Sequence, residues 1–139
     1  MKLILQDNNA YVLNAGVGEE IIGELREFCR ENKIDAGKFF AIGAAQEVKL
    51  GWYDVDTKEY TWKEYKEKLE VVSLLGNIAW KENEVIAHAH GSFSNRQMEM
   101  MGGHVAKLVV GGACEVMLTK FAGHIKKAYD EQTGLNLMQ

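Results

Sequence analysis

Only one segment of this chain has the apolar spacing of an α-helix. This feature restricts the possible folds more than any other, because the fold must be built with a single helix. Between Glu19 and about Asn32, the apolar side chains fall on one stripe of a helix. This stripe consists of Ile21, Ile22, Leu25, Phe28 and Cys29. Glu19 and Glu20 stand at its start, where the helix dipole favours negative charge. The sequence therefore predicts one amphipathic helix.

The rest of the chain has the pattern of strands joined by turns. The predicted strands are residues 3–5, 11–14, 39–53 with a bend near Gly43, 60–62, 69–75 with a continuation over 78–80, 85–93, 104–110, 114–121 and 135–138. Gly111-Gly112 is typical of a hairpin turn and is expected to join the strands 104–110 and 114–121. No linker or repeat interrupts the chain, so we expect one α+β domain over residues 1–139, with about six or seven strands.

The predicted sheet is wider than one helix can cover. Six or seven strands at about 4.8 Å spacing make a sheet roughly 30 Å wide, whereas a helix is about 10–12 Å across. In the strand 104–110, alternation places apolar side chains on both faces. One face holds Val105 and Val109, and the other holds Ala106, Leu108 and Val110. Either the sheet curls into a barrel or another copy of the chain covers it, and we favour the second alternative.

The charge balance of the chain is acidic. It has 16 basic and 20 acidic residues, for a net charge of −4. Proteins that bind nucleic acid through its phosphates usually have a basic excess or a dense basic cluster. The densest basic stretch, residues 58–68, also contains Glu59, Glu64 and Glu67, which is typical of a solvated strand face. We therefore expect only weak contact with DNA.

Two features bear on the compartment. No apolar run approaches the roughly 18 residues of a membrane span, and the apolar part of residues 1–5 is too short for a signal peptide. We therefore expect a cytoplasmic protein with no membrane partner. Cys29 lies on the predicted helix and Cys114 on a predicted strand, without the spacing of a disulfide framework, so both are expected to be buried free thiols.

Three of the four histidines lie between residues 88 and 104. His88 and His90 are two apart on a predicted strand, so both side chains project from one face. His104, at the start of the strand after the 91–103 connection, can complete a three-histidine set with an open fourth position. We predict a divalent metal on His88, His90 and His104, with Zn²⁺ ahead of other transition metals. The alternative is hydrogen-bonded sheet histidines without metal. His124 is interpreted as a surface residue.

Several neighbouring residues permit both a functional and a structural interpretation. The methionines of the 91–103 connection can line an apolar pocket or fill gaps at a subunit contact. These methionines are Met98, Met100 and Met101. Arg96 and Glu99 can orient an anion or carry a proton, or they can form a solvated pair. Glu115 can accept a hydrogen bond from a ligand histidine, or it can face water. No catalytic acid or base is assigned.

These motifs together resemble those of the plants-and-prokaryotes-conserved (PPC) domain. The motifs are Leu69-Glu-Val-Val-Ser-Leu-Leu-Gly-Asn, Ala87-His-Ala-His-Gly-Ser-Phe, Gly102-Gly-His-Val, Cys114-Glu-Val-Met-Leu and Asp130-Glu-Gln-Thr-Gly-Leu. The resemblance covers nearly the whole chain and implies one helix on a mostly antiparallel sheet, assembled as a homotrimer. The fold is also similar to that of acetolactate decarboxylase, which holds zinc on a comparable set of histidines. This resemblance implies that His88, His90 and His104 are the metal ligands here.

Two functions follow from the residues and the resemblance. Prokaryotic members of the PPC family are commonly described as predicted DNA-binding proteins. Together with the implied trimer and the predicted metal site, this description suggests a trimeric, metal-binding, regulatory protein. The plant relatives carry an AT-hook with an Arg-Gly-Arg-Pro core, and this chain contains no proline. The alternative is a zinc-dependent enzyme that acts on a small carboxylate- or carbonyl-bearing molecule, with the anion held at the metal.

Overall fold

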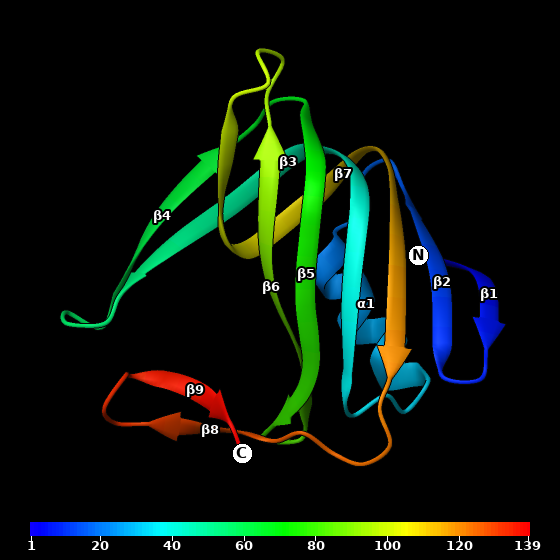
Figure 1. The fold of residues 1–139 in the computed structure, drawn as a ribbon, viewed down its shortest axis with the longest axis vertical. Coiled ribbons are helices and arrows are strands. Elements are labelled where there is room, and N and C mark those ends of the chain that lie inside the picture. The colour runs from blue at the N-terminus through cyan, green and yellow to red at the C-terminus, as the bar shows by residue number, and fades with distance from the viewer.

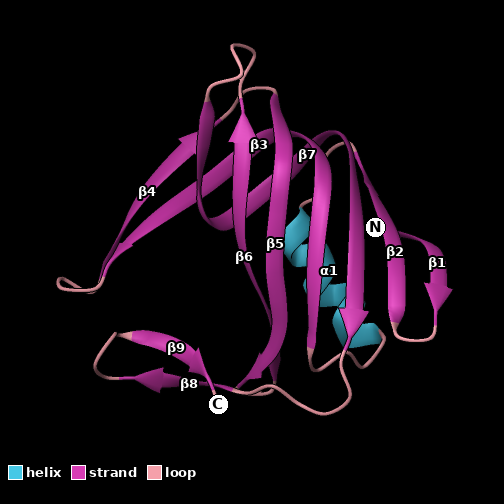
Figure 2. Cartoon of the chain, viewed as in Figure 1, coloured by secondary structure: helices cyan, strands magenta, loops and turns pink.

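The computed structural model describes residues 1–139 and contains one helix and nine strands. These elements are β1 (Lys2–Asp7), β2 (Ala10–Gly16), α1 (Ile21–Glu31), β3 (Gly37–Asp54), β4 (Glu59–Tyr65), β5 (Leu69–Lys81), β6 (Glu84–Ser94), β7 (Met100–Lys120), β8 (Lys127–Asp130) and β9 (Leu135–Met138). Strands β1 to β7 form one antiparallel sheet, and β8 and β9 form a separate hairpin (Figures 1 and 2). The predicted fold class, α+β with a mostly antiparallel sheet and one main helix, is confirmed.

The large sheet curls so far that it closes on itself. Its strand order is β1-β2-β7-β6-β5-β3-β4, and β7 pairs in addition with β3. The pairing runs from Gly37 opposite Lys120 to Gly51 opposite His104, so the strands β3, β5, β6 and β7 form a ring. The curled sheet is the alternative that the sequence analysis did not favour. A partner chain is therefore not needed to cover the inner face.

The predicted hairpin at Gly111-Gly112 is wrong, because both glycines lie inside the continuous strand β7. They mark the place where β7 bends across β3. A Cβ atom on Gly111 would lie 2.8 Å from the carbonyl oxygen of Ala45, and the register of the two strands shifts here. Glycine thus permits a close backbone approach at a bulge rather than a chain reversal. Strand β7 also begins earlier than predicted, so the connection between β6 and β7 is residues 95–99 and not 91–103.

A second irregularity in β7 corrects the predicted alternation of its apolar residues. Val105 pairs with Leu50 and Lys107 pairs with Lys49, so β7 has one extra residue, Ala106, at this point. Such a bulge reverses the facing of the residues on one side of it. Val105 therefore lies on the same buried face as Leu108, and Ala106 is exposed. The predicted placement of these side chains is wrong because the sequence pattern does not reveal the bulge.

The helix packs against β6 and β7 on the inner face of the sheet, and in Figure 1 it is seen behind the first part of β3 and the last part of β7. Its start is fixed by Glu20, whose carboxylate accepts hydrogen bonds from the backbone N–H of Ile22 (3.1 Å) and Gly23 (2.8 Å). The same carboxylate accepts a bond from the N–H of Leu108 in β7 (3.1 Å). One side chain therefore caps the helix and ties it to the sheet. The buried stripe comprises Ile21, Leu25 and Cys29.

Both cysteines are buried and free, as predicted. Burial raises the pKa of Cys29 to about 12 and that of Cys114 to about 11, so neither thiol forms the reactive thiolate at neutral pH. The structure has no helix with the length and apolar character to cross a membrane.

The C-terminal segment forms a hairpin, of which the sequence indicated only the second strand, residues 135–138. Strand β8 precedes it, and the turn between the two strands is held by Asp130, which accepts hydrogen bonds from the N–H and hydroxyl of Thr133 (2.8 and 2.7 Å). The hairpin contacts the tip of the β3–β4 hairpin. Tyr53 Oη donates to the carbonyl of Thr133 (2.7 Å), and Lys58 Nζ donates to the carbonyl of Glu131 (2.6 Å). The two hairpins therefore support each other across one side of the molecule.

Candidate metal centre

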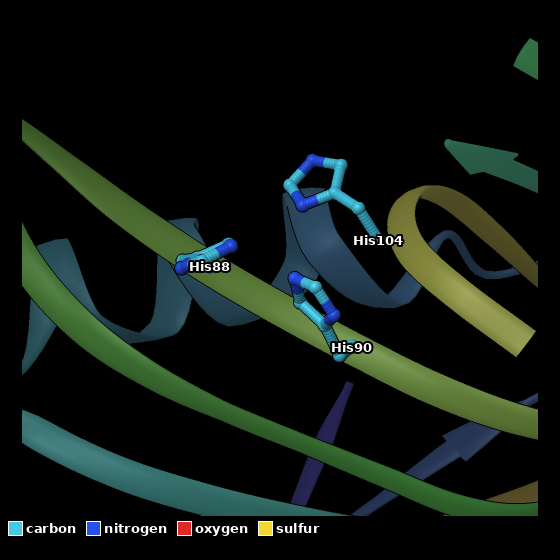
Figure 3. A group of neighbouring side chains, drawn as sticks. All are labelled: His88, His90 and His104. Atoms are coloured by element: carbon cyan, nitrogen blue, oxygen red, sulfur yellow. The ribbon is translucent and has the colours of Figure 1, made fainter. Parts of the chain in front are cut away.

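The three predicted histidines meet where β6 and β7 part. His88 and His90 project from β6, and His104 faces them from β7 (Figure 3). His90 and His104 are direct partners in the last pair of the β6–β7 ladder, while His104 also pairs with Gly51 of β3. Beyond this pair β7 follows β3, so His88 is left without a β7 neighbour at its side. The three imidazole rings therefore lie where β7 separates from β6.

The rings form a nearly equilateral triangle. The distances between ring centroids are 5.2 Å for His88–His90, 5.1 Å for His88–His104 and 5.5 Å for His90–His104. One nitrogen from each ring can be chosen so that all three lie within 4.8 Å of one another. In a tetrahedral zinc site with Zn–N bonds of 2.0–2.1 Å, the nitrogens are about 3.3 Å apart. Side-chain rotation that closes the gaps by at most about 1.5 Å would complete the site.

The chemistry of the rings fits a metal. Burial lowers the pKa of His88 to about 4, with smaller contributions from the charges of Lys127, His104 and His90. Burial also lowers the pKa of His104, followed by the charges of His90 and Lys127. These two imidazoles are therefore neutral at pH 7 and have a lone pair to offer. Nδ1 of His104 is buried without a hydrogen-bond partner, which a ligand to this ring would correct.

Two aromatic rings of β4 flank His104. The ring of Tyr60 lies 5.4 Å from the imidazole and that of Trp62 lies 6.0 Å away, and the two rings stack on each other at 4.6 Å. They fold over Gly51, which lies between Trp62 and His104 in the sheet. A Cβ atom on Gly51 would come within 2.6 Å of Trp62, so only glycine allows the rings to lie here. The sequence indicated that Tyr60 and Trp62 share a strand face, but nothing in it linked them to the histidines.

Lys127 is the other residue that the sequence analysis missed. It stands at the start of β8 and is partly buried, and this burial lowers the pKa of its ammonium group. The group is near enough to His88 and His104 to depress the pKa of both rings. Its side chain makes no hydrogen bond or ion pair with the rest of the chain. No local signal in the sequence points to it, because about 40 residues separate it from the His-x-His pair.

The remaining candidates lie away from the triad. Met98 and Met100 are exposed, at 83% and 59%, while Met101 is half-buried against the core. Arg96 and Glu99 are exposed and do not pair with each other; Glu99 accepts a hydrogen bond from Asn95 instead. Glu115 faces solvent, so it does not support a ligand histidine. The fourth histidine, His124, is a surface residue as predicted.

His124 lies at the rim of a recess of about 440 Å³ near the end of β5. Its Nδ1 is 2.9 Å from a carboxylate oxygen of Asp35, whose other oxygen accepts a hydrogen bond from the Trp80 indole (2.7 Å). The recess also borders Lys126 and Lys127. It does not include the three histidines of the candidate centre.

A family model and several solved structures are similar to this chain. The model of the Plants and Prokaryotes Conserved (PCC) domain, abbreviated PPC above, matches residues 5–122. A protein from Bacteroides thetaiotaomicron, provisionally described as DNA-binding, has 28% sequence identity and a TM-score of 0.93, with 97% of this chain and 94% of that chain covered. A metal-containing protein from Archaeoglobus fulgidus has 35% identity and a TM-score of 0.90, with 100% and 99% covered.

A more distant likeness concerns the fold alone. Acetolactate decarboxylase from Bacillus subtilis has 14% identity and a TM-score of 0.59, with 83% of this chain and 54% of that chain covered. No curated protein sequence matches this chain.

Proposed function

Since this chain belongs to the Plants and Prokaryotes Conserved domain family, we propose that it is a metal-binding member in which His88, His90 and His104 hold one divalent ion, zinc first. The observation that carries the proposal is the convergence of three ring nitrogens within 4.8 Å. The similar protein from Archaeoglobus fulgidus is described as metal-containing, which supports it. Imidazole nitrogens suit Zn²⁺ better than Mg²⁺ or Ca²⁺, which prefer oxygen ligands.

The protonation state and the number of the histidines both suit such a centre. Burial keeps His88 and His104 neutral, so the protein need not lose protons from these rings when it takes up a metal at pH 7. Three protein ligands leave a fourth position for water or a small molecule. A zinc ion bound here supplies a Lewis acid or lowers the pKa of a bound water.

Metal analysis of the purified protein tests the proposal. We expect about one zinc ion per chain, and a loss of most of it in His88→Ala and in His104→Ala. His124→Ala is the matched control, because that ring is exposed and lies outside the triad. Protein that takes up no divalent transition metal from micromolar solutions would contradict the proposal. Unchanged metal content in both triad variants would place the site elsewhere.

We also propose that the protein assembles as a homotrimer. Two exposed apolar surfaces support self-association. Strand β1, at one edge of the sheet, exposes both faces, and the outer faces of β3 and β5 carry a second patch. The exposed residues are Leu3, Ile4 and Leu5 in β1, and Phe40, Ile42, Val72 and Leu75 in the second patch. Apolar patches of this kind mark subunit contacts, and the number three comes from the family.

Light scattering tests the assembly, with an expected mass of three times the 15.6 kDa chain. Phe40 and Leu75 are cross-strand partners, so the double variant Phe40→Lys, Leu75→Lys places two charges in the second patch and is expected to reduce the mass. Val17→Lys is the control, because this residue is also exposed but lies in a turn outside both patches. A wild-type monomer at micromolar concentration would contradict the trimer.

DNA contact, which the Bacteroides thetaiotaomicron protein's description suggests, is proposed here only as a weak interaction. The net charge is −4, and two of the four lysines of the basic stretch are already engaged. Lys58 binds the Glu131 carbonyl and Lys63 lies over the Tyr65 ring. We expect a Kd no tighter than about 10⁻⁵ M at physiological salt, which is non-specific binding. Fluorescence anisotropy with AT-rich and mixed duplexes measures it, and nanomolar binding that prefers one sequence would contradict it.

The second candidate function is a zinc-dependent enzyme acting on a small carboxylate- or carbonyl-bearing molecule. The specific observation that favours it is the unpaired, partly buried ammonium of Lys127 beside the triad. A regulatory metal site that binds no small molecule has no need of this cation. Turnover also requires a proton donor or acceptor, and we assign none.

A further inference from the structure

The C-terminal hairpin lies outside the residues that the family model matches, and hydrogen bonds attach it to β5 and to the β3–β4 hairpin. At its base, the Trp80 N–H of β5 donates to the carbonyl of Ile125 (2.8 Å), while the Gln139 N–H donates to the carbonyl of Lys126 (2.9 Å) and closes the hairpin itself. At its turn, Tyr53 and Lys58 donate to the carbonyls described above. The hairpin is therefore anchored at both ends, so the position of Lys127 is set by the fold and not by a free tail.

Lys127 is a cation without a partner. It is partly buried, and a buried ammonium is costly unless an anion or hydrogen-bond acceptors compensate it. Asp130, the acidic residue of the same strand, is occupied by Thr133. The charge of Lys127 contributes to the lowered pKa of His88 and of His104, so its ammonium lies in the neighbourhood of these two rings. Asp35 and Glu82 border the same recess as Lys127, but Asp35 is engaged by His124 and Trp80, and Glu82 lies 3.6 Å from Lys81. No carboxylate of the chain pairs with Lys127, so its ammonium is free to bind an anionic ligand.

Unpartnered polar atoms accompany this cation. The side-chain oxygens of Asn77 and Asn136 are both buried without a hydrogen-bond partner. Asn77 is the cross-strand partner of His88, so it lies on the triad's face of the sheet. Asn136 is the partner of Tyr129, which alternation places on the same hairpin face as Lys127. Buried polar groups are nearly always satisfied, so two orphan oxygens on the faces that carry His88 and Lys127 support a polar ligand there.

We infer that Lys127 binds the carboxylate of a small organic anion at the open position beside His88, His90 and His104. The stacked rings of Tyr60 and Trp62 form the apolar side of the same site. This inference rests on the proposed metal centre and adds its ligand class and a specificity-determining residue. One lysine and one open metal position match the two oxygens of a carboxylate, and the flat rings favour a flat, unsaturated body.

Anion titrations of the zinc-loaded protein test this assignment. Acetate and benzoate serve as carboxylate probes and inorganic phosphate as the competing class, with calorimetry as the readout. We expect Lys127→Gln to weaken acetate binding about tenfold or more, because a charge-assisted hydrogen bond is lost. Lys127→Arg should retain most of the affinity. Lys126→Gln is the matched control, since this neighbour is exposed and its charge does not contribute to the pKa of His88 or His104.

The aromatic side has its own variant. Benzoate should bind more tightly than acetate to the wild type, and Trp62→Leu should remove that preference while acetate affinity stays the same. Circular dichroism of each variant confirms that the fold is kept. If Lys127→Gln unfolds the hairpin, Lys127→Met, which keeps the length of the side chain, gives the same comparison.

Four results would overturn the inference. These are equal acetate affinity in Lys127→Gln and wild type, no carboxylate binding to the wild type at tens of millimolar, phosphate binding more tightly than both carboxylates, and equal loss in Lys126→Gln. Zinc content is measured on every sample before an anion is added. Wild-type protein without zinc therefore identifies a failure of the metal centre, which also removes this inference, whereas full zinc content with unchanged anion affinity identifies a failure of the inference alone.

Discussion

Lowering the pH of the metal-free protein should destabilise it through His88. Burial holds the folded-state pKa of this ring at about 4, whereas an unfolded histidine has a value of about 6.5. Between these values the unfolded chain binds the proton and the folded chain does not. The free energy of unfolding therefore falls as the pH drops from about 6.5 to about 4, and the contribution of His88 is complete only above pH 6.5.

The magnitude follows from the two pKa values. At pH 4.5 the linkage relation gives a loss of at most about 2.5 kcal/mol relative to pH 7.5. Small domains have about 5–15 kcal/mol of stability in all, so this loss is measurable. His104 contributes in the same direction, since burial lowers its pKa as well. Carboxylates such as Asp130, whose pKa is lowered by its hydrogen bonds to Thr133, add a further loss as the pH falls toward and below 4.

Urea unfolding of the wild type and of His88→Gln, with a chelator present, is measured at pH 7.5 and at pH 4.5. The difference between the two proteins isolates the contribution of His88 to the free energy of unfolding. The stability of the wild type relative to the variant should fall by up to about 2.5 kcal/mol between the two pH values. His124→Gln is the matched control and should not reproduce this fall, because that ring is exposed and lies outside the triad. A wild-type-minus-variant difference that is the same at both pH values would refute the argument that burial controls this ring.

Two further predictions concern the packing around the centre. Gly51→Ala places a Cβ atom within 2.6 Å of Trp62 and 2.9 Å of Tyr60, so we expect a loss of about 1–3 kcal/mol in urea unfolding and a changed tryptophan emission. Zinc content should be retained, and its loss would show that the aromatic rings position His104. The thiols of Cys29 and Cys114 should react with a thiol reagent only in denaturant, and rapid reaction in the native protein would contradict their burial.

The helix and the histidine pair were predictable because their signals are local. The apolar stripe and the acidic start of α1 depend on residues within about ten positions of one another, and the observed helix lies within the predicted range. In the same way, His88 and His90 share a face because they are two apart on a strand. His104 could be added because a strand follows after a short connection. The structure brings these three predicted residues together.

The irregularities of β7 were not predictable from local pattern. A pair of glycines indicates a turn in most hairpins, and here the same pair permits a close approach to Ala45 instead. The bulge at Ala106 likewise leaves no mark in the sequence, yet it decides that Val105 is buried. Both features arise from the crossing of β3 and β7, which are about 60 residues apart. They let the sheet curl and close.

The two parts of the candidate site differ in how the chain holds them. The triad sits on β6 and β7, whose register is set by the closed ring of strands, and it lies inside the family's matched residues. Lys127, Tyr60 and Trp62 instead come from two hairpins that brace each other through Tyr53 and Lys58. Substitutions in the hairpins are therefore expected to change the proposed anion ligand while the three histidines stay in place. Relatives that share the triad are then expected to differ in ligand where the residue at the position of Lys127 differs.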